Sequence, residues 1–301
     1  MSTNDDAQTQ SPARGSIGRD TAQLSRRRML KGSGAALAAL GLIGTTGFGK
    51  SPSVYASEQE QVMSERHGSN KPRIVLVHGA WADGTGWQHI IPLLEDDGFP
   101  VIAVQNPLTS FADDIATTKR VIDAEAQKGP VVVVGHSYGG AVISGAADNP
   151  NVKALVYLAA FAPDAGEPVG ALLGQFPPTP LGAAFVVDTA GFVYIDRTKF
   201  REIFAGDVDR TEVRVMAAAQ KPASGAIFGQ SAATAAWKSI PSWYLVSTQD
   251  QTLHPDMERF YAQRMGATTS EIDASHVAFI SRPRAVVSFI EKAAKAVVGN
   301  A

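Results

Sequence analysis

Three side chains that lie far apart in the chain are of the types that nucleophilic catalysis at a carbonyl carbon requires. Ser137 stands in the run Gly135-His136-Ser137-Tyr138-Gly139. A serine hydroxyl is a weak nucleophile near neutral pH, so it needs a histidine base, which in turn needs an acid to orient it. Asp250 and His276 follow the serine in the order acid, then base. The sequence therefore predicts acyl transfer through Ser137, with His276 as base and Asp250 as acid.

The segments around Ser137 predict a sharp turn between a strand and a helix. Residues 131–134 are four consecutive valines, as in a strand buried on both faces, and 141–147 is a small-residue helical segment. Glycine at 135 and 139 leaves room at this junction, and the turn lifts the serine hydroxyl above the sheet at a helix N-terminus. Gly-x-Ser-x-Gly alone also occurs in structural turns, so its position between this strand and helix is what favours a nucleophile.

Short apolar runs alternate with helical patterns along most of the chain. Strands are predicted at 74–77, 101–104, 131–134, 152–158, 243–246 and 268–272, and helices at 87–97, 111–127, 141–147, 257–265 and 284–298. This alternation predicts an α/β fold with a mostly parallel, doubly wound sheet. The alternation of strands and helices stops between Pro163 and Pro241. This stretch is too long for a loop. It predicts an inserted, mainly helical cap at about 164–240, over the sheet edge where ligands bind.

Other histidines and acids compete for the roles of base and orienting acid. They are His67, His89, His254, Asp164 and Asp273. The three histidines fall in helical or helix-entry positions or in the polar segment before the first strand. Asp164 follows an earlier strand and is the alternative acid, whereas Asp273 is too close in sequence to His276 to reach behind its ring. His276 and Asp250 each follow a late strand, at the sheet edge predicted for Ser137.

The oxyanion of a tetrahedral intermediate needs backbone N–H donors. One predicted donor is Tyr138, the residue after the nucleophile. The other is Ala80, in His78-Gly79-Ala80-Trp81 directly after the first predicted strand, where Gly79 permits close approach. The alternative for this segment is an ordinary strand-to-helix loop.

The first 56 residues differ from the rest and predict export. Ser25-Arg26-Arg27-Arg28-Met29-Leu30-Lys31 precedes a weakly apolar stretch from 32 to 49, and resembles the twin-arginine (Tat) consensus. Val54-Tyr55-Ala56 predicts cleavage after Ala56, followed by a flexible lead-in at 57–71 and a hydrolase domain at 72–301. The alternatives are an uncleaved membrane anchor and a disordered basic tail, although six glycines in 32–49 disfavour a span. Cleavage predicts a periplasmic or secreted protein with the Tat machinery as an earlier partner and no stable membrane association.

Composition excludes several classes of chemistry and partner. The chain of 301 residues has no cysteine, which excludes thiol catalysis, disulfides and Cys-ligated zinc. Its net charge of −2 includes seven Lys/Arg and three Asp/Glu in the first 56 residues, so the remainder is near −6. A mildly acidic body without a basic patch argues against a nucleic-acid partner.

These motifs together resemble one branch of the α/β-hydrolase superfamily. The resemblance rests on Val75–Trp81, on the Gly135–Gly140 turn, on Leu158-Ala159-Ala160-Phe161-Ala162-Pro163-Asp164, and on Asp250 and His276. The branch holds plant methyl esterases, hydroxynitrile lyases and bacterial esterases similar to pyrethroid hydrolases. The resemblance implies a Ser137–Asp250–His276 triad, Ala80 and Tyr138 as oxyanion donors, no metal, no organic cofactor and a small-molecule ester substrate.

Two departures from the lyases favour hydrolysis. The lyases carry lysine directly after the catalytic histidine and threonine after the strand's histidine, where this chain has Val277 and Gly79. A hydroxynitrile lyase or another carbonyl-adduct enzyme remains the alternative activity, and a ligand-binding protein with a vestigial triad is the alternative class. Aromatic residues of the cap favour a small apolar or aromatic ester, although each could equally pack the cap itself: Phe176, Phe185, Phe192, Phe200, Phe204, Phe228 and Trp237.

Overall fold

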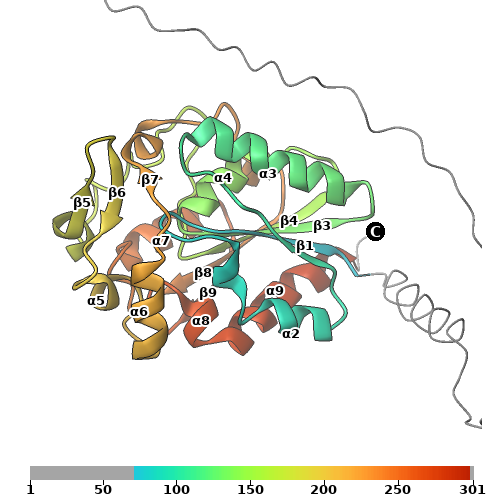
Figure 1. The fold of residues 1–301 in the computed structure, drawn as a ribbon. Coiled ribbons are helices and arrows are strands. Elements are labelled where there is room, and N and C mark those ends of the chain that lie inside the picture. The colour runs from blue at the N-terminus through green and yellow to red at the C-terminus, as the bar shows by residue number, and fades with distance from the viewer. Residues whose placement is uncertain (1–70, 299–301) are drawn as a thin grey trace, which may run out of the picture. The chain divides into compact units, whose positions relative to one another are not determined.

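A six-stranded parallel sheet forms the centre of residues 71–298, the part of the chain that the computed structural model describes (Figure 1). The strands, in the spatial order β2-β1-β3-β4-β8-β9, are Val101–Ala103, Arg73–Val77, Val131–His136, Val152–Leu158, Ser242–Ser247 and Thr268–Ile272. Every neighbouring pair is parallel. The predicted α/β sheet is thereby confirmed. The predicted export signal and all but the last residue of the lead-in lie outside the described residues.

The apolar runs in β1 and β3 are explained by their central position. Each lies between two other strands, and Ile74–Val77 and Val131–Val134 have no exposed surface. A strand covered on both faces has no side exposed to solvent, so its sequence is a continuous run of apolar residues and does not alternate between apolar and polar ones. These two strands fix the sheet edge at which the candidate site lies.

Helices cover both faces of the sheet. They are α2 (Ile91–Asp96), α3 (Phe111–Ala126), α4 (Tyr138–Ala146), α7 (Pro255–Arg264), α8 (Ala278–Ser281) and α9 (Pro283–Val298). Figure 1 shows α3 and α4 on one face, with α2 and α9 on the other. Pro92 lies in the first turn of α2, where a residue without an N–H is tolerated. The helix predicted from residue 87 therefore begins only at Ile91, after a separate 3-10 turn at Gly84–Trp87.

The cap contains helical elements, as the sequence predicts, and in addition a small antiparallel sheet that the sequence analysis does not predict. Its helical elements are α5 (Phe200–Phe204), α6 (Arg210–Ala218) and 3-10 helices at Pro180–Ala184, Gly225–Gly229 and Ala236–Lys238. Its sheet consists of β5 (Phe185–Val187), β6 (Phe192–Ile195) and β7 (Ala223–Ser224). The runs Phe-Val-Val and Phe-Val-Tyr-Ile around Gly191 are the β-branched and aromatic hairpin signal, which the irregular composition of the region obscured. Gly191 has φ +82° and lies in the connecting turn.

The cap is joined to the carboxyl ends of β1 and β2. Trp81 pairs with Lys221 in an isolated bridge, and Ser224 N donates to Leu108 O at 2.9 Å. The Trp81 indole N–H donates to Val193 O in β6 at 2.9 Å. The cap therefore lies over the sheet edge that the sequence predicted. Within 71–298, no helix combines the length and the apolar character that crossing a membrane requires.

Candidate active site

Ser137 occupies a strained turn between β3 and α4. Its backbone has φ +53° and ψ −125°, a region that costs a residue with a Cβ free energy and occurs mostly at functional positions. The backbone is held by three hydrogen bonds: Ser137 N donates to Leu158 O, and Ser137 O accepts from Gly140 N and Phe161 N. The side-chain hydroxyl makes no hydrogen bond with any residue of 71–298.

Gly139 is required because β1 crosses the first turn of α4 at close range. A Cβ at position 139 would lie 2.4 Å from Val77 O and 2.7 Å from His78 O. Both are backbone atoms that cannot rotate away. The close crossing brings the loop after β1 against Ser137, and a Cβ at Gly79 would lie 2.8 Å from Ser137 Cβ. The two glycine-dependent approaches set the predicted oxyanion loop beside the serine.

His276 and Asp250 form a buried pair at the carboxyl ends of β9 and β8. His276 Nδ1 lies 2.5 Å from Asp250 Oδ2, and neither side chain is exposed. Asp250 Oδ1 accepts from Thr252 N at 2.6 Å and from Leu253 N at 3.0 Å. Because a carboxylate only accepts, His276 carries its proton on Nδ1, which leaves Nε2 as the bare nitrogen. That Nε2 is buried and has no hydrogen-bond partner among the described residues.

His136, the residue before Ser137, contacts His276. The His136 and His276 rings are 4.6 Å apart between centroids, and His136 Nε2 donates to His276 O at 3.0 Å. Burial and the adjacent His276 hold the pKa of His136 well below its ordinary value, so its ring is neutral. No hydrogen bond joins the Ser137 hydroxyl to His276 Nε2 in the described residues; such bonds commonly tighten only when substrate binds.

The two predicted oxyanion donors flank Ser137. Tyr138 is the first residue of α4, and Ala80 is buried after β1. Neither backbone N–H donates to a backbone acceptor within 71–298. His78 stabilises this loop through two hydrogen bonds of its ring. Its Nε2 accepts from Asn106 N at 3.0 Å, and its Nδ1 donates to Gly79 O at 2.9 Å. Burial lowers the pKa of His78 from 6.5 to about 4, so this residue stays neutral in the donor–acceptor arrangement that the loop needs.

Five aromatic rings pack together beside His276 and at Tyr138, the residue after the serine, and two of them come from the cap. Phe204 lies 5.0 Å from the His276 ring, and Phe228 lies 6.0 Å from Tyr138 and from Phe161. Trp81 contacts both cap residues at 6.3 Å. The sequence could not separate these from the other cap aromatics, because Phe176, for example, packs on Phe260 instead, at 5.8 Å.

The competing residues lie away from this cluster. His89 pairs with Glu212, and His254 caps α7. Asp164 pairs with Lys238 at 2.5 Å on the surface, and Asp273 is exposed. His67 lies outside the described residues.

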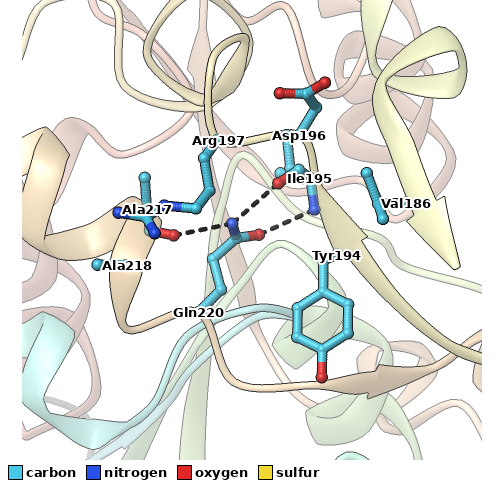
Figure 2. Close-up of a pocket in the computed structure, with 8 residues that line it drawn as sticks. All are labelled: Val186, Tyr194, Ile195, Asp196, Arg197, Ala217, Ala218 and Gln220. Carbon is cyan, nitrogen blue, oxygen red and sulfur yellow. Dashed lines mark hydrogen bonds between the residues drawn. The ribbon is translucent and has the colours of Figure 1, made fainter. Parts of the chain in front are cut away.

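A cavity of about 480 Å³ opens in the cap, apart from the serine. Figure 2 shows its lining of Val186, Tyr194, Ile195, Asp196, Arg197, Ala217, Ala218 and Gln220. The Gln220 amide accepts from Ile195 N and donates to the carbonyl oxygens of Ile195 and Ala217. Gln220 thus ties β6 to the end of α6, and its polar atoms are already engaged by the cap backbone.

The chain is similar in sequence and in structure to known hydrolases. A sequence model described as the alpha/beta hydrolase family matches residues 74–289. "Probable hydrolase R7" of Phoma sp. is 29% identical over 235 residues, which cover 71% of this chain and 94% of that protein. A carbendazim hydrolyzing esterase of Nocardioides sp. is 34% identical over 125 residues, which cover 37% of this chain and 51% of that protein. The crystal structure of a pyrethroid hydrolase from Sphingobium faniae superposes with a TM-score of 0.64 at 25% identity, covering 75% and 98% of the two chains.

Proposed function

The chain belongs to the alpha/beta hydrolase family, and on that premise we propose that it is a serine esterase that cleaves carboxylic esters through an acyl-enzyme on Ser137. The observation that carries the proposal is the state of His276. Its Nδ1 is bound to Asp250 while its buried Nε2 has no partner in the described part of the chain. An esterase and a pyrethroid hydrolase among the similar proteins support ester cleavage.

In the proposed mechanism, His276 moves the protons and Asp250 stays ionised throughout. His276 Nε2 takes the proton of the Ser137 hydroxyl as the oxygen attacks the ester carbonyl. Asp250 stabilises the imidazolium, and the N–H groups of Ala80 and Tyr138 bind the oxyanion. His276 then gives that proton to the leaving alcohol, so an acyl-Ser137 ester remains. A water molecule, deprotonated by His276, releases the carboxylic acid and restores the serine.

We propose a small ester with an apolar or aromatic acyl or alkyl group as the substrate. The support is the ring cluster beside His276 and Tyr138, in which Trp81 and Phe204 are buried and Phe228 is partly buried. Such walls offer no charged partner for a polar substrate, whereas they favour flat or branched apolar groups.

Two other functions are weighed against this one. A hydroxynitrile lyase would need a cation near the cyanide, and the position after His276 is Val277, which is apolar and buried. A ligand-binding protein with a vestigial triad would have no need to keep His276 Nε2 bare and both oxyanion amides free. Both observations favour the esterase.

A fluorophosphonate probe and an ester series test the proposed function. We expect the probe to label Ser137 covalently, and aryl esters of medium acyl length to turn over with equal release of alcohol and acid. Mandelonitrile should release no cyanide above the blank. A folded protein that ignores the probe and all esters would instead indicate a binding protein, and cyanide release lost in Ser137→Ala would indicate the lyase.

We further propose export by the Tat route, which would make the mature protein periplasmic or secreted. The support is the run Ser25–Lys31 and the small residues before Ala56. N-terminal sequencing of the protein from a Tat-competent bacterial host should start at Ser57. Replacing Arg26 and Arg27 by lysine should leave the uncleaved chain in the cytoplasm; unchanged processing in that variant would contradict the proposal.

A further inference from the structure

A second carboxyl group, Glu258 in α7, is buried beside the acid of the triad. Its side chain has no exposed surface. Oε2 accepts from Ser247 N, at the end of β8, at 3.0 Å. Oε1 is buried without a hydrogen-bond partner in the described residues when both acids are written as carboxylates. The Asp250 backbone N–H donates to Ser247 O at 3.2 Å, so Ser247 joins both acids at the end of β8, and the charge of Asp250 acts on Glu258.

Two carboxylates in contact present only acceptor atoms, so neither can satisfy the other. One proton between them converts the contact into a hydrogen bond. Glu258 Oε2 accepts a hydrogen bond from Ser247 N–H. The proton of the carboxylic acid is therefore placed on the other oxygen, Oε1. Asp250 accepts three N–H groups, from Thr252, Leu253 and His276. A carboxylate offers about four lone-pair sites, so one remains for a proton donor.

The surroundings decide which acid holds the proton. Three N–H donors favour the ionised form of Asp250, whereas Glu258 has one donor and is fully buried. Among the described residues, the cation whose charge acts on Glu258 is Arg259, whose guanidinium is exposed and bound to Asp256 and Glu271 at 2.8 and 2.7 Å. Tyr244, the other buried titratable group facing it, is hydrogen-bonded to the Ala160 backbone. Burial first, then the charge of Asp250, raises the pKa of Glu258 well above its ordinary value.

We propose that Glu258 is a neutral carboxylic acid at neutral pH and that it positions the triad by donating a hydrogen bond from Oε1 to the Asp250 carboxylate. This inference deepens the proposed esterase function and rests on it. Glu258 acts through Asp250 and does not reach the substrate. It fixes the plane of the carboxylate that orients His276, and it leaves a single negative charge behind the imidazole.

Two substitutions separate a neutral donor from a charged or merely space-filling residue. Glu258→Gln is neutral and can still donate to Asp250 and accept from Ser247, so we expect it to keep at least about a third of kcat, with the acidic limb of the kcat/KM profile unmoved. Glu258→Leu removes both bonds and should lower kcat about tenfold, with KM within about threefold. Equal losses in the two variants, or an acidic limb that moves by a pH unit in Glu258→Gln, would overturn the proposal.

An infrared measurement tests the proton itself and does not depend on catalysis. At neutral pH the folded protein should show the carbonyl stretch of a buried protonated carboxylic acid, and the band should be absent from Glu258→Gln. If the wild type cleaves no ester but shows this band, the esterase function fails while the proton assignment stands. If esters are cleaved and the band is absent, the assignment fails alone.

Glu125 provides the matched control, since it is also a buried glutamate but pairs with Arg73 and Lys128. Glu125→Gln should lower the urea midpoint of unfolding, because two cations lose their carboxylate. Glu258→Gln should leave the midpoint unchanged or raise it. A lower midpoint in Glu258→Gln, matching that of Glu125→Gln, would indicate that Glu258 is ionised and would overturn the assignment even if the leucine variant does not fold.

Discussion

Replacement of Ser137 by alanine is expected to lower kcat for aryl esters by about 10⁴-fold or more, with KM within a few-fold. The variant loses the only nucleophile of the proposed mechanism, and it retains the oxyanion donors and the aromatic walls that bind the substrate. The hydroxyl makes no hydrogen bond in 71–298, and alanine meets the same backbone strain at φ +53°. The free energy of unfolding should therefore change by less than about 1 kcal/mol.

Steady-state kinetics and urea unfolding of the same preparation measure these two expectations. Ser270→Ala, on the exposed edge strand β9, is the matched serine control and should turn over like the wild type. Activity in Ser137→Ala within tenfold of the wild type would remove Ser137 as the nucleophile. A large loss of stability in that variant would instead mean that the hydroxyl has a structural partner.

The strands of the sheet and the order of the site residues could be predicted because each depends on residues that are close together in the sequence. A central strand that is buried on both faces is a continuous apolar run in the sequence, as the four valines of β3 show. The start of α4 was less predictable, since it begins at Tyr138 and not at residue 141. Gly139 and Gly140 are poor helix formers and are required by close contacts with Val77 O and Phe161 O. Those contacts come from distant parts of the chain.

Glu258 shows why part of the site could not be predicted. Glutamate on a helix that also carries Asp256 and Arg259 is normally solvent-exposed. Only the packing of α7 against the end of β8 buries this one carboxyl group and brings it to Asp250. The cap hairpin was missed for a different reason: its strands β5 and β6 have three and four residues, and such short runs carry little periodic signal.

Asp250→Asn is expected to lower kcat by about 10⁴-fold although the side chain keeps its size and shape. Asp250 Oδ1 accepts from the backbone N–H groups of Thr252 and Leu253. An asparagine must keep its carbonyl oxygen at that position, because an NH₂ group cannot accept those bonds. Its NH₂ group then faces His276 Nδ1. This forces the His276 proton to Nε2, the nitrogen that must be bare to take the proton of Ser137.

The backbone contacts of Asp250 also separate this tautomer effect from a loss of folding. In Asp250→Asn both N–H groups remain paired, so the unfolding free energy should change little. In Asp250→Ala they are left unpaired in a buried loop, at a cost of about 1–3 kcal/mol each.

Asp164→Asn, at the surface pair with Lys238, is the control for the rejected acid and should keep wild-type kcat. If Asp164→Asn lost activity and Asp250→Asn kept it, Asp164 and not Asp250 would be the acid that orients His276. An equal stability loss in the Asn and Ala variants would show that asparagine does not keep the hydrogen bonds to Thr252 and Leu253. Its NH₂ group would then not be fixed toward His276, and the loss of activity could not be assigned to the wrong His276 tautomer.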